Sequence, residues 1–414
     1  MLDLVIIGGG HAGLAASHRA STRGLDHVVL ERGRVGESWR AQRWDSFTLN
    51  TPNRMNPLPG SPYRGTEPDV FLTRDAWVAR LERYVDQHRL PVHSGAAVTA
   101  VEREGDAFAV TTAAEQFITR NVIVASGTIN APRVPAVAAG LDPAVFRTTT
   151  GAYRRPADLP PGGVLVVGSA QSGVQIVEDL LADGRDVHLS TGRVGRVARR
   201  IRGRDSLVWL TETGWMEQRP SDLPDPAMLR WAQPQISGVG PLGHTVSLQS
   251  LATAGVTLHG RLAGIEGTRV RFAPDLPQNV GFADEVAGRI RQHIDEHIAR
   301  AGIIAPPSDP DPADEPVADP TRFVGTAELD LAERGIRSVV FATGFSGDFS
   351  WLHVPVIDDR GAPIHVEGRS PVAGLWFLGF PWLRTRKSGI IWGAVEDSAA
   401  IVDQVVARTG ALSR

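Results

Sequence analysis

LVIIGGGHAG, residues 4–13, is the stretch that decides the fold of this 414-residue chain. Its four apolar residues predict a buried strand, and the glycines after them predict a tight turn that opens into a helix over Leu14 to Ala20. A second strand, Val28 to Leu30, follows and ends at the acidic residue Glu31. This order of strand, glycine turn, helix, strand and acid is typical of a dinucleotide-binding βαβ unit.

Each glycine has a physical task in such a unit. Gly8 turns the chain, Gly10 lets the backbone approach a pyrophosphate, and Gly13 lets the helix pack closely on the strand. The amino end of the helix would hold the anion, and Glu31 would accept a hydrogen bond from a ribose hydroxyl. We therefore predict that a dinucleotide is bound here by Gly8, Gly10, His11, Ala12, Gly13, Glu31 and Arg32.

A second unit of the same kind begins at Val164. The apolar run 164–167 leads into the turn Gly168-Ser169-Ala170-Gln171-Ser172-Gly173, a helical stretch over Val174 to Leu181 and a strand over Val187 to Leu189. Ala170 stands where the first unit has its middle glycine. Two βαβ units predict an α/β protein with two dinucleotide sites.

The strand of the second unit ends without an acid, and six arginines follow within residues 193–204. An adenosine 2′-phosphate needs such donors, which favours NADPH over NADH. The alternatives are a solvated basic face and a partner for the acidic loop. We predict that the second dinucleotide contacts Gly168, Gln171, Ser172, Gly173, Ser190, Arg193 and Arg200. Helix capping is the alternative role for Gln171 and Ser172.

Two shorter stretches, Val122 to Gly127 and Val339 to Gly344, each run from a buried strand into a turn of small residues. Backbone can approach a ligand closely at such turns, so Ala125, Gly127, Thr343 and Gly344 are further candidate cofactor contacts. Because the second stretch follows the second βαβ unit, we expect that unit to be inserted into the first domain. The expected domains are residues 1–150 with 322–414, and 151–321. A proline-rich and acidic stretch, Ala305 to Pro320, is expected to be an exposed connector.

Composition excludes several classes of function. The chain has no cysteine, so disulfides, thiol nucleophiles and iron–sulfur clusters are absent and redox chemistry needs a bound cofactor. A net charge of −3 gives no basis for binding nucleic acid, and no apolar run approaches the roughly 18 residues of a membrane span. The first residues are predicted to be a strand and not a signal peptide, so we expect a cytoplasmic protein.

The stretch His293 to His297 matches the HxxEH zinc pattern. However, Val286, Ile290 and Ile294 form the apolar stripe of the same helix, and no third ligand follows. We predict no metal site.

Taken together, these motifs resemble the FAD- and NADPH-dependent flavin monooxygenases, the class that includes flavin-containing and Baeyer–Villiger monooxygenases, and in particular its bacterial CzcO-type branch. The resemblance runs nearly from end to end. It includes both glycine turns and the stretches Gly36-Glu37-Ser38-Trp39, Leu49-Asn50-Thr51-Pro52, Gly192 to Arg196, Phe341 to Phe345 and Arg386-Lys387-Ser388-Gly389. It implies a glutathione-reductase-like fold, an FAD domain with an inserted NADPH domain.

The resemblance also implies roles for single residues. Ser38 and Trp39 would lie along the ribityl and flavin portion of FAD, and Asn50 would sit near the flavin and help hold NADP+ or the oxygenated flavin. The alternative for Asn50 is a turn residue before Pro52. Lys387, the only lysine among 43 basic residues, precedes a helix over Val395 to Val406 and would face the flavin or NADP; an exposed position is its alternative.

The activity implied is that NADPH reduces FAD, and that a C4a-peroxyflavin or hydroperoxyflavin then oxygenates a small molecule at N, S or a carbonyl carbon. The substrates would be that molecule and O2, and a homodimer is among the assemblies expected. One departure is Thr149, which stands where the family fingerprint has a histidine. This keeps open an NADPH-dependent reductase or oxidase, and a non-enzymatic FAD-binding regulatory protein.

Overall fold

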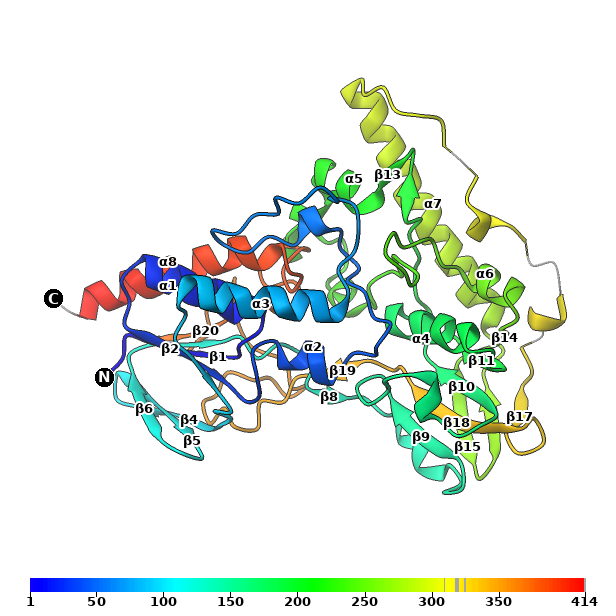
Figure 1. Ribbon diagram of the computed structural model, residues 1–414, viewed down its shortest axis with the longest axis horizontal. Helices are drawn as coiled ribbons and strands as arrows, with labels where there is room; N and C mark the ends of the chain where they lie inside the picture. The colour runs from blue at the N-terminus through cyan, green and yellow to red at the C-terminus, as the bar shows by residue number, and fades with distance from the viewer. Residues whose placement is uncertain (309, 317–319, 324, 413–414) are drawn as a thin grey trace.

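The computed structural model describes residues 1–308, 310–316, 320–323 and 325–412. Residues 309 and 317–319 of the expected connector lie outside this part of the chain. Figure 1 shows two lobes side by side, with both chain ends at the outer end of the first lobe. Each lobe contains a five-stranded sheet, and the two sheets share no strand.

The first lobe is built on a parallel sheet in the order β20-β7-β1-β2-β3. Its central strands are buried along their whole length, since both faces are covered. The helices α1 (His11–Thr22) and α8 (Gly393–Leu412) pack together. The strands of this sheet are β1 (Leu4–Ile7), β2 (His27–Glu31), β3 (Val92–Ser94), β7 (Val122–Val124) and β20 (Leu375–Phe377).

A three-stranded antiparallel sheet contributes to the same core through Val101, Phe108 and Val110. Two further helices, α2 (Glu37–Ala41) and α3 (Arg74–His88), belong to this lobe. Thr73 caps α3 by accepting a hydrogen bond from the Ala76 N–H. The antiparallel strands are β4 (Val98–Glu104), β5 (Ala107–Thr112) and β6 (Gln116–Thr119).

The second lobe repeats the plan with the order β14-β11-β10-β18-β9. Helices α4 (Gln171–Ala182) and α6 (Leu248–Thr253) contribute to one core cluster of this sheet, and a small antiparallel sheet contributes to another. The strands are β9 (Phe146–Thr149), β10 (Gly163–Val167), β11 (Val187–Ser190), β14 (Thr257–His259) and β18 (Ile336–Phe341), with β15 (Leu262–Glu266), β16 (Arg269–Phe272) and β17 (Glu328–Asp330) in the small sheet.

A third cluster in this lobe contains α5 (Ser206–Glu212), the hairpin of β12 (Arg200–Ile201) with β13 (Arg204–Asp205), and the long helix α7 (Leu276–Ala301). The stripe Ile290, Ile294 and Ile298 of α7 is buried, as the apolar spacing predicts. No group of three His, Asp or Glu residues among those described is placed to hold a metal ion. Within the same residues, no helix is both long and apolar enough to cross a membrane.

The border between the two lobes, as the strand pairing defines it, differs from the domain border predicted from the sequence. β9 and β18 were expected in the first domain, but both run parallel to the strands of the second sheet, where β18 lies between β10 and β9. The pattern of Val339 to Gly344 resembles that of Val122 to Gly127 because each ends a strand beside a glycine turn, and it does not specify which sheet the strand joins. We propose that the insert runs from Arg133 to Gly344.

The two chain crossings between the lobes lie next to each other. β8 (Ala131–Pro132) pairs antiparallel with β19 (Phe345–Ser346). Beside this pair, the Arg133 N–H donates to the Gly344 carbonyl at 2.9 Å, and the Thr343 hydroxyl donates to the Arg133 carbonyl. The chain thus passes between the lobes twice, both times within one short two-stranded ribbon.

Candidate cofactor site

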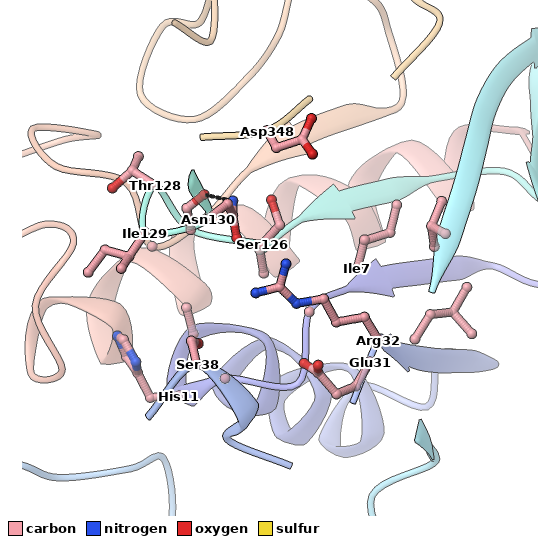
Figure 2. Close-up of a pocket in the computed structure, with 18 of the residues that line it drawn as sticks. Ile7, His11, Glu31, Arg32, Ser38, Ser126, Thr128, Ile129, Asn130 and Asp348 are labelled. Atoms are coloured by element: carbon pink, nitrogen blue, oxygen red, sulfur yellow. Dashed lines mark hydrogen bonds between the residues drawn. The ribbon is translucent and has the colours of Figure 1, made fainter. Parts of the chain in front are cut away.

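A cavity of about 460 Å³ opens at the carboxyl end of β1. Figure 2 shows Glu31 and Arg32 on one side of it, His11 and Ser38 near the helix end, and Ser126, Asn130 and Asp348 on the other side. Ligands of open α/β sheets bind at this end of the strands. The predicted residues that line the cavity are Gly8, Gly10, His11, Ala12, Glu31, Arg32, Ser38, Trp39, Ala125 and Gly127.

Three of the four glycines in the first turn, Gly8, Gly10 and Gly13, differ in what surrounds them. A Cβ on Gly8, whose φ is +116°, would lie 2.5 Å from the Ala125 carbonyl oxygen, and a Cβ on Gly13 would lie 1.9 Å from the Gly8 oxygen. Close packing of strand and helix therefore requires both glycines. A Cβ on Gly10 would meet no protein atom within 4 Å. Gly10 is the glycine whose open side faces the space a ligand would take.

The amino end of α1 lacks protein partners of its own. Gly10 occupies the cap position, where no side chain accepts from the first N–H groups. The Nε2 atom of His11 is buried and has no hydrogen-bond partner among the described residues. Burial lowers the pKa of His11 to about 4, so the ring is neutral near pH 7. Exposed helix N–H groups at a cavity form a site for an anion such as a pyrophosphate.

Glu31 is held in place by the same turn. Its Oε2 accepts from the Gly9 N–H at 2.6 Å, and its Oε1 accepts from the Gly33 N–H at 2.9 Å. Each carboxylate oxygen keeps a further lone pair for a ribose hydroxyl. The acid is thus fixed at the end of β2, beside the cavity.

Sequence reasoning missed several residues that line the cavity. The Arg43 guanidinium lies 5.3 Å from the Trp39 ring centre and 5.5 Å from that of Phe47. Burial lowers the pKa of Arg43 to about 10, which leaves it charged near neutral pH. No motif marks Arg43 in the sequence. The other missed polar residues, Ser126, Thr128, Asn130 and Asp348, lie in loops whose position depends on the fold.

The second glycine turn repeats the geometry of the first. Gly168 has φ +110°, and a Cβ on it would lie 2.5 Å from the Ala342 carbonyl oxygen. A Cβ on Gly173 would lie 1.8 Å from the Gly168 oxygen. Ala342 thus occupies the position that Ala125 has in the first lobe. The structure shows two turns with one backbone plan, in which glycines allow the same close contact between strand and helix.

Other predicted residues of the second unit bond within the protein. The Gln171 Nε2 donates to the Ser237 carbonyl at 2.5 Å, and its Oε1 accepts from the Ile236 N–H at 2.8 Å. The Ser190 hydroxyl is buried and donates to the Gly260 carbonyl at 3.0 Å. Residues 236 and 237 therefore cover the amino end of α4, where Ser172 lies in the first turn. Thr343 and Gly344 lie at the ribbon between the lobes.

The arginine cluster divides into two groups. Arg196, Arg199, Arg202 and Arg204 form ion pairs with acids, as in the pairs of Arg196 with Asp284 and Asp314. Arg193 and Arg200 are exposed and form no ion pair within the described part of the chain. The Arg193 guanidinium lies 4.3 Å from the Phe282 ring centre, and Arg200 donates to the Leu242 carbonyl at 2.7 Å. Arg193 and Arg200 are therefore the two arginines of the cluster without an acidic partner among the described residues.

Asn50 lies between the lobes and is not among the residues that line the cavity. Its Oδ1 accepts from the Gln175 Nε2 at 3.1 Å, and its carbonyl accepts from Arg199 at 3.0 Å. Gln175 and Arg199 both belong to the second lobe. The structure places Asn50 in a contact between the lobes.

Lys387 is buried, so the alternative of an exposed lysine is wrong. Its Nζ lies 2.5 Å from a Glu217 carboxylate oxygen of the second lobe and 2.8 Å from one of Glu396 in α8. The backbone N–H of Lys387 also donates to the Met216 carbonyl. Lys387 is not among the cavity-lining residues; its contacts with Glu217 and Met216 join the C-terminal part of the first lobe to the second lobe.

Replacing Lys387 by methionine is expected to lower the free energy of unfolding by about 1–2 kcal/mol, since both glutamates are half-exposed. The two carboxylates raise the pKa of Lys387 above its usual 10.5. Its stabilisation is therefore present near pH 7 and disappears as the pH rises through that raised value. Urea unfolding and melting curves from pH 7 to 11 measure this. Lys387→Arg, which keeps the charge, should lose less, and equal losses would contradict an electrostatic role.

Comparison with known proteins agrees with this geometry. The family described as pyridine nucleotide-disulphide oxidoreductase matches residues 5–211. A relative from Geobacillus kaustophilus, an uncharacterized CzcO-like oxidoreductase, is 28% identical over 409 residues, 98% of this chain and 99% of that protein. Indole-3-pyruvate monooxygenase YUCCA1 from rice is 31% identical over 184 residues, 44% of this chain and 45% of its own length.

Two solved structures show the same fold. A flavin-containing monooxygenase from Stenotrophomonas maltophilia has a TM-score of 0.68 at 20% identity, with 98% of each chain covered. A bacillithiol disulfide reductase from Staphylococcus aureus has a TM-score of 0.60 at 15% identity, again with 98% of each chain covered. The predicted α/β fold with two dinucleotide-binding domains is confirmed.

Proposed function

Because the chain belongs to the pyridine nucleotide-disulphide oxidoreductase family, we propose that it is an FAD-dependent monooxygenase that uses NADPH and transfers one oxygen atom of O2 to a small molecule. The class of enzyme and the two cofactors predicted from the sequence agree with its relatives and structural neighbours, which include flavin monooxygenases and OTEMO, solved in complex with FAD and NADP. The observation that carries the proposal is the pair of equivalent glycine turns in a chain without cysteine.

The missing cysteines separate two reactions that share this fold. A disulphide reductase, the kind of enzyme that the family name describes, passes electrons through cysteine thiols. This chain has no cysteine to receive them. Electrons that enter at the second turn must therefore leave the protein from the bound cofactor itself. We propose that O2 accepts these electrons, as it does in a monooxygenase.

The residues of the first turn fit FAD. The open side of Gly10, the uncapped end of α1 and the unpartnered His11 Nε2 leave room and donors for its pyrophosphate, and Glu31 is fixed for its ribose. Bound FAD would supply hydride acceptance from NADPH and electron delivery to O2. The protein would hold the ring beside Ser38 and Trp39 and limit the access of water. Asn50 would bridge the lobes where nicotinamide and flavin approach.

Three finer points stay proposals from the sequence. Oxygen would be transferred to N, S or a carbonyl carbon of the substrate. The protein would act in the cytoplasm, and it would form a homodimer.

An NADPH oxidase that releases all of its oxygen as peroxide is the second candidate. Thr149, which replaces the histidine of the family fingerprint, favours it. Thr149 ends β9, and its carbonyl accepts from the Tyr153 N–H at 2.8 Å. Thr149 has a hydroxyl and no imidazole, so it cannot supply the ring nitrogens of that histidine.

The test is to measure NADPH consumption, peroxide release and oxygenated product with a panel of amines, sulfides and ketones. A monooxygenase gives product and less peroxide with at least one of them. Rapid mixing of the reduced enzyme with O2, with and without NADP+, should show a transient absorbance distinct from oxidised and reduced flavin. Complete conversion of NADPH electrons to peroxide with every compound would favour the oxidase.

The two unpaired arginines give a prediction about the nucleotide. Arg193→Ala and Arg200→Ala should each raise the KM for NADPH roughly tenfold, because a charged hydrogen bond to the 2′-phosphate is lost. The KM for NADH, which lacks that phosphate, should change little. Arg289→Ala, at an exposed position of α7, is the matched control. Equal losses for the two nucleotides would show that the cluster does not bind the 2′-phosphate.

A further inference from the structure

A second hollow lies on the first lobe, outside the cofactor cavity. It is formed by α3 and the loop 61–64, has a volume of about 430 Å³ and shares no lining residue with the cavity. We call it the α3 hollow. Its volume lies in the range of sites for small organic molecules.

Three arginines line the α3 hollow: Arg64 from the loop, and Arg80 and Arg83 one turn apart on α3. No aspartate or glutamate lines it, and none of the three forms an ion pair within the described part of the chain. The neighbouring acid of α3, Glu82, is paired with Arg40 instead. Three cations that share a hollow without a counter-charge repel one another.

Arg80 is fixed in the hollow and not free to turn into solvent. Its Nη2 donates to the Ser61 carbonyl at 3.1 Å, and its guanidinium lies 5.8 Å from the Trp77 ring centre. Burial and the charge of Arg83 lower the pKa of Arg80. The protein therefore keeps a partly buried cation next to a second one, which is unfavourable unless an anion joins them.

The remaining walls describe the rest of the ligand. Pro62, Leu72 and Ala76 give an apolar side. The Tyr63 hydroxyl accepts from the Glu67 N–H at 3.0 Å, which leaves its own proton to donate. Guanidinium groups bind phosphate through paired hydrogen bonds. We propose that the α3 hollow binds a small organic phosphate whose apolar part lies against Pro62 and Leu72.

This site is independent of the proposed oxidoreductase activity, so its test measures binding. Phenyl phosphate is titrated by calorimetry into the purified FAD-loaded protein without nicotinamide nucleotide. One site should be seen, weaker at high salt, with no heat from phenol. Arg64→Gln and Arg83→Gln, both at exposed positions, should each weaken binding roughly tenfold.

Arg89→Gln, directly after α3 and outside the hollow, is the matched control and should leave the affinity unchanged. Arg193→Ala should also leave it unchanged, because that arginine is assigned to NADPH. Retained FAD and an unchanged melting curve show that each variant is folded. Absence of binding, equal loss in the Arg89 or Arg193 variant, or binding only to vesicles that contain phosphatidic acid would overturn the proposal.

Discussion

Replacing Gly10 by valine is expected to yield a folded protein that purifies without FAD. A Cβ at this position would meet no protein atom within 4 Å, so the fold leaves room for it, and the larger side chain enters the space next to the amino end of α1. The pyrophosphate would lose its close approach to the backbone there. We expect the dissociation constant for FAD to rise at least a hundredfold, roughly 2.7 kcal/mol. Flavin fluorescence during reconstitution of the apoprotein measures it.

Two controls make this result specific. A Cβ on Gly288 would likewise meet no atom within 4 Å apart from the backbone of its own helix, α7, so Gly288→Val should retain FAD fully. Gly10→Ala should weaken FAD binding less than valine, since the second turn already carries Ala170 at the equivalent position. By contrast, Gly13→Val should also unfold the turn, because a Cβ would lie 1.9 Å from the Gly8 oxygen. Full FAD content in Gly10→Val would show that the cofactor does not lie at this turn.

Arg199→Ala is expected to destabilise the protein more than any other arginine substitution considered above. Its side chain is 1% exposed and pairs with the buried Asp205. It also donates to the carbonyls of Asn50 and Ile236 and stacks on Phe71, with 4.9 Å between guanidinium and ring centre. Removing it leaves a buried carboxylate without its cation. The expected loss is about 3–5 kcal/mol in the free energy of unfolding, measured by urea denaturation.

A double variant separates the charge from the packing. Asp205→Asn combined with Arg199→Ala should lose less than Arg199→Ala alone, because no unpaired charge stays buried. Arg289→Ala, from an exposed pair on α7, should change stability by about 0–1 kcal/mol. A similar small loss for Arg199→Ala would mean that the Asp205 carboxylate is solvated and that the buried ion pair adds little to the stability of the second lobe.

The fold could be predicted largely because it depends on local patterns. The glycines at 8 and 13 specify a backbone contact so close that other residues cannot take their place, and the same holds for 168 and 173. The pairing of β18 could not be predicted in the same way. Its residues form a buried strand in either sheet, and only the three-dimensional partners β9 and β10 decide between them.

Site residues could be predicted where they belong to one continuous sequence motif. They could not be predicted where segments far apart in the sequence meet in the fold. Glu31 follows the first turn after one helix and one strand, and it lines the cavity as expected. Arg43 and Asp348 reach the same cavity from loops without a motif. The burial of Lys387 could not be predicted from the sequence, because one of its partners, Glu217, lies 170 residues away in the chain. Burial and charge pairing of this kind depend on tertiary structure.

The place of β20 at the edge of the first sheet has a consequence for the order in which the chain folds during synthesis. β20, residues 375–377, pairs with β7, residues 122–124. All strands of the second sheet lie between residues 146 and 341. The ribosome therefore releases every strand of the inserted sheet before the first sheet can gain its last strand. The lobe made first in sequence is expected to mature last, and until then its unpaired β7 edge needs protection from aggregation.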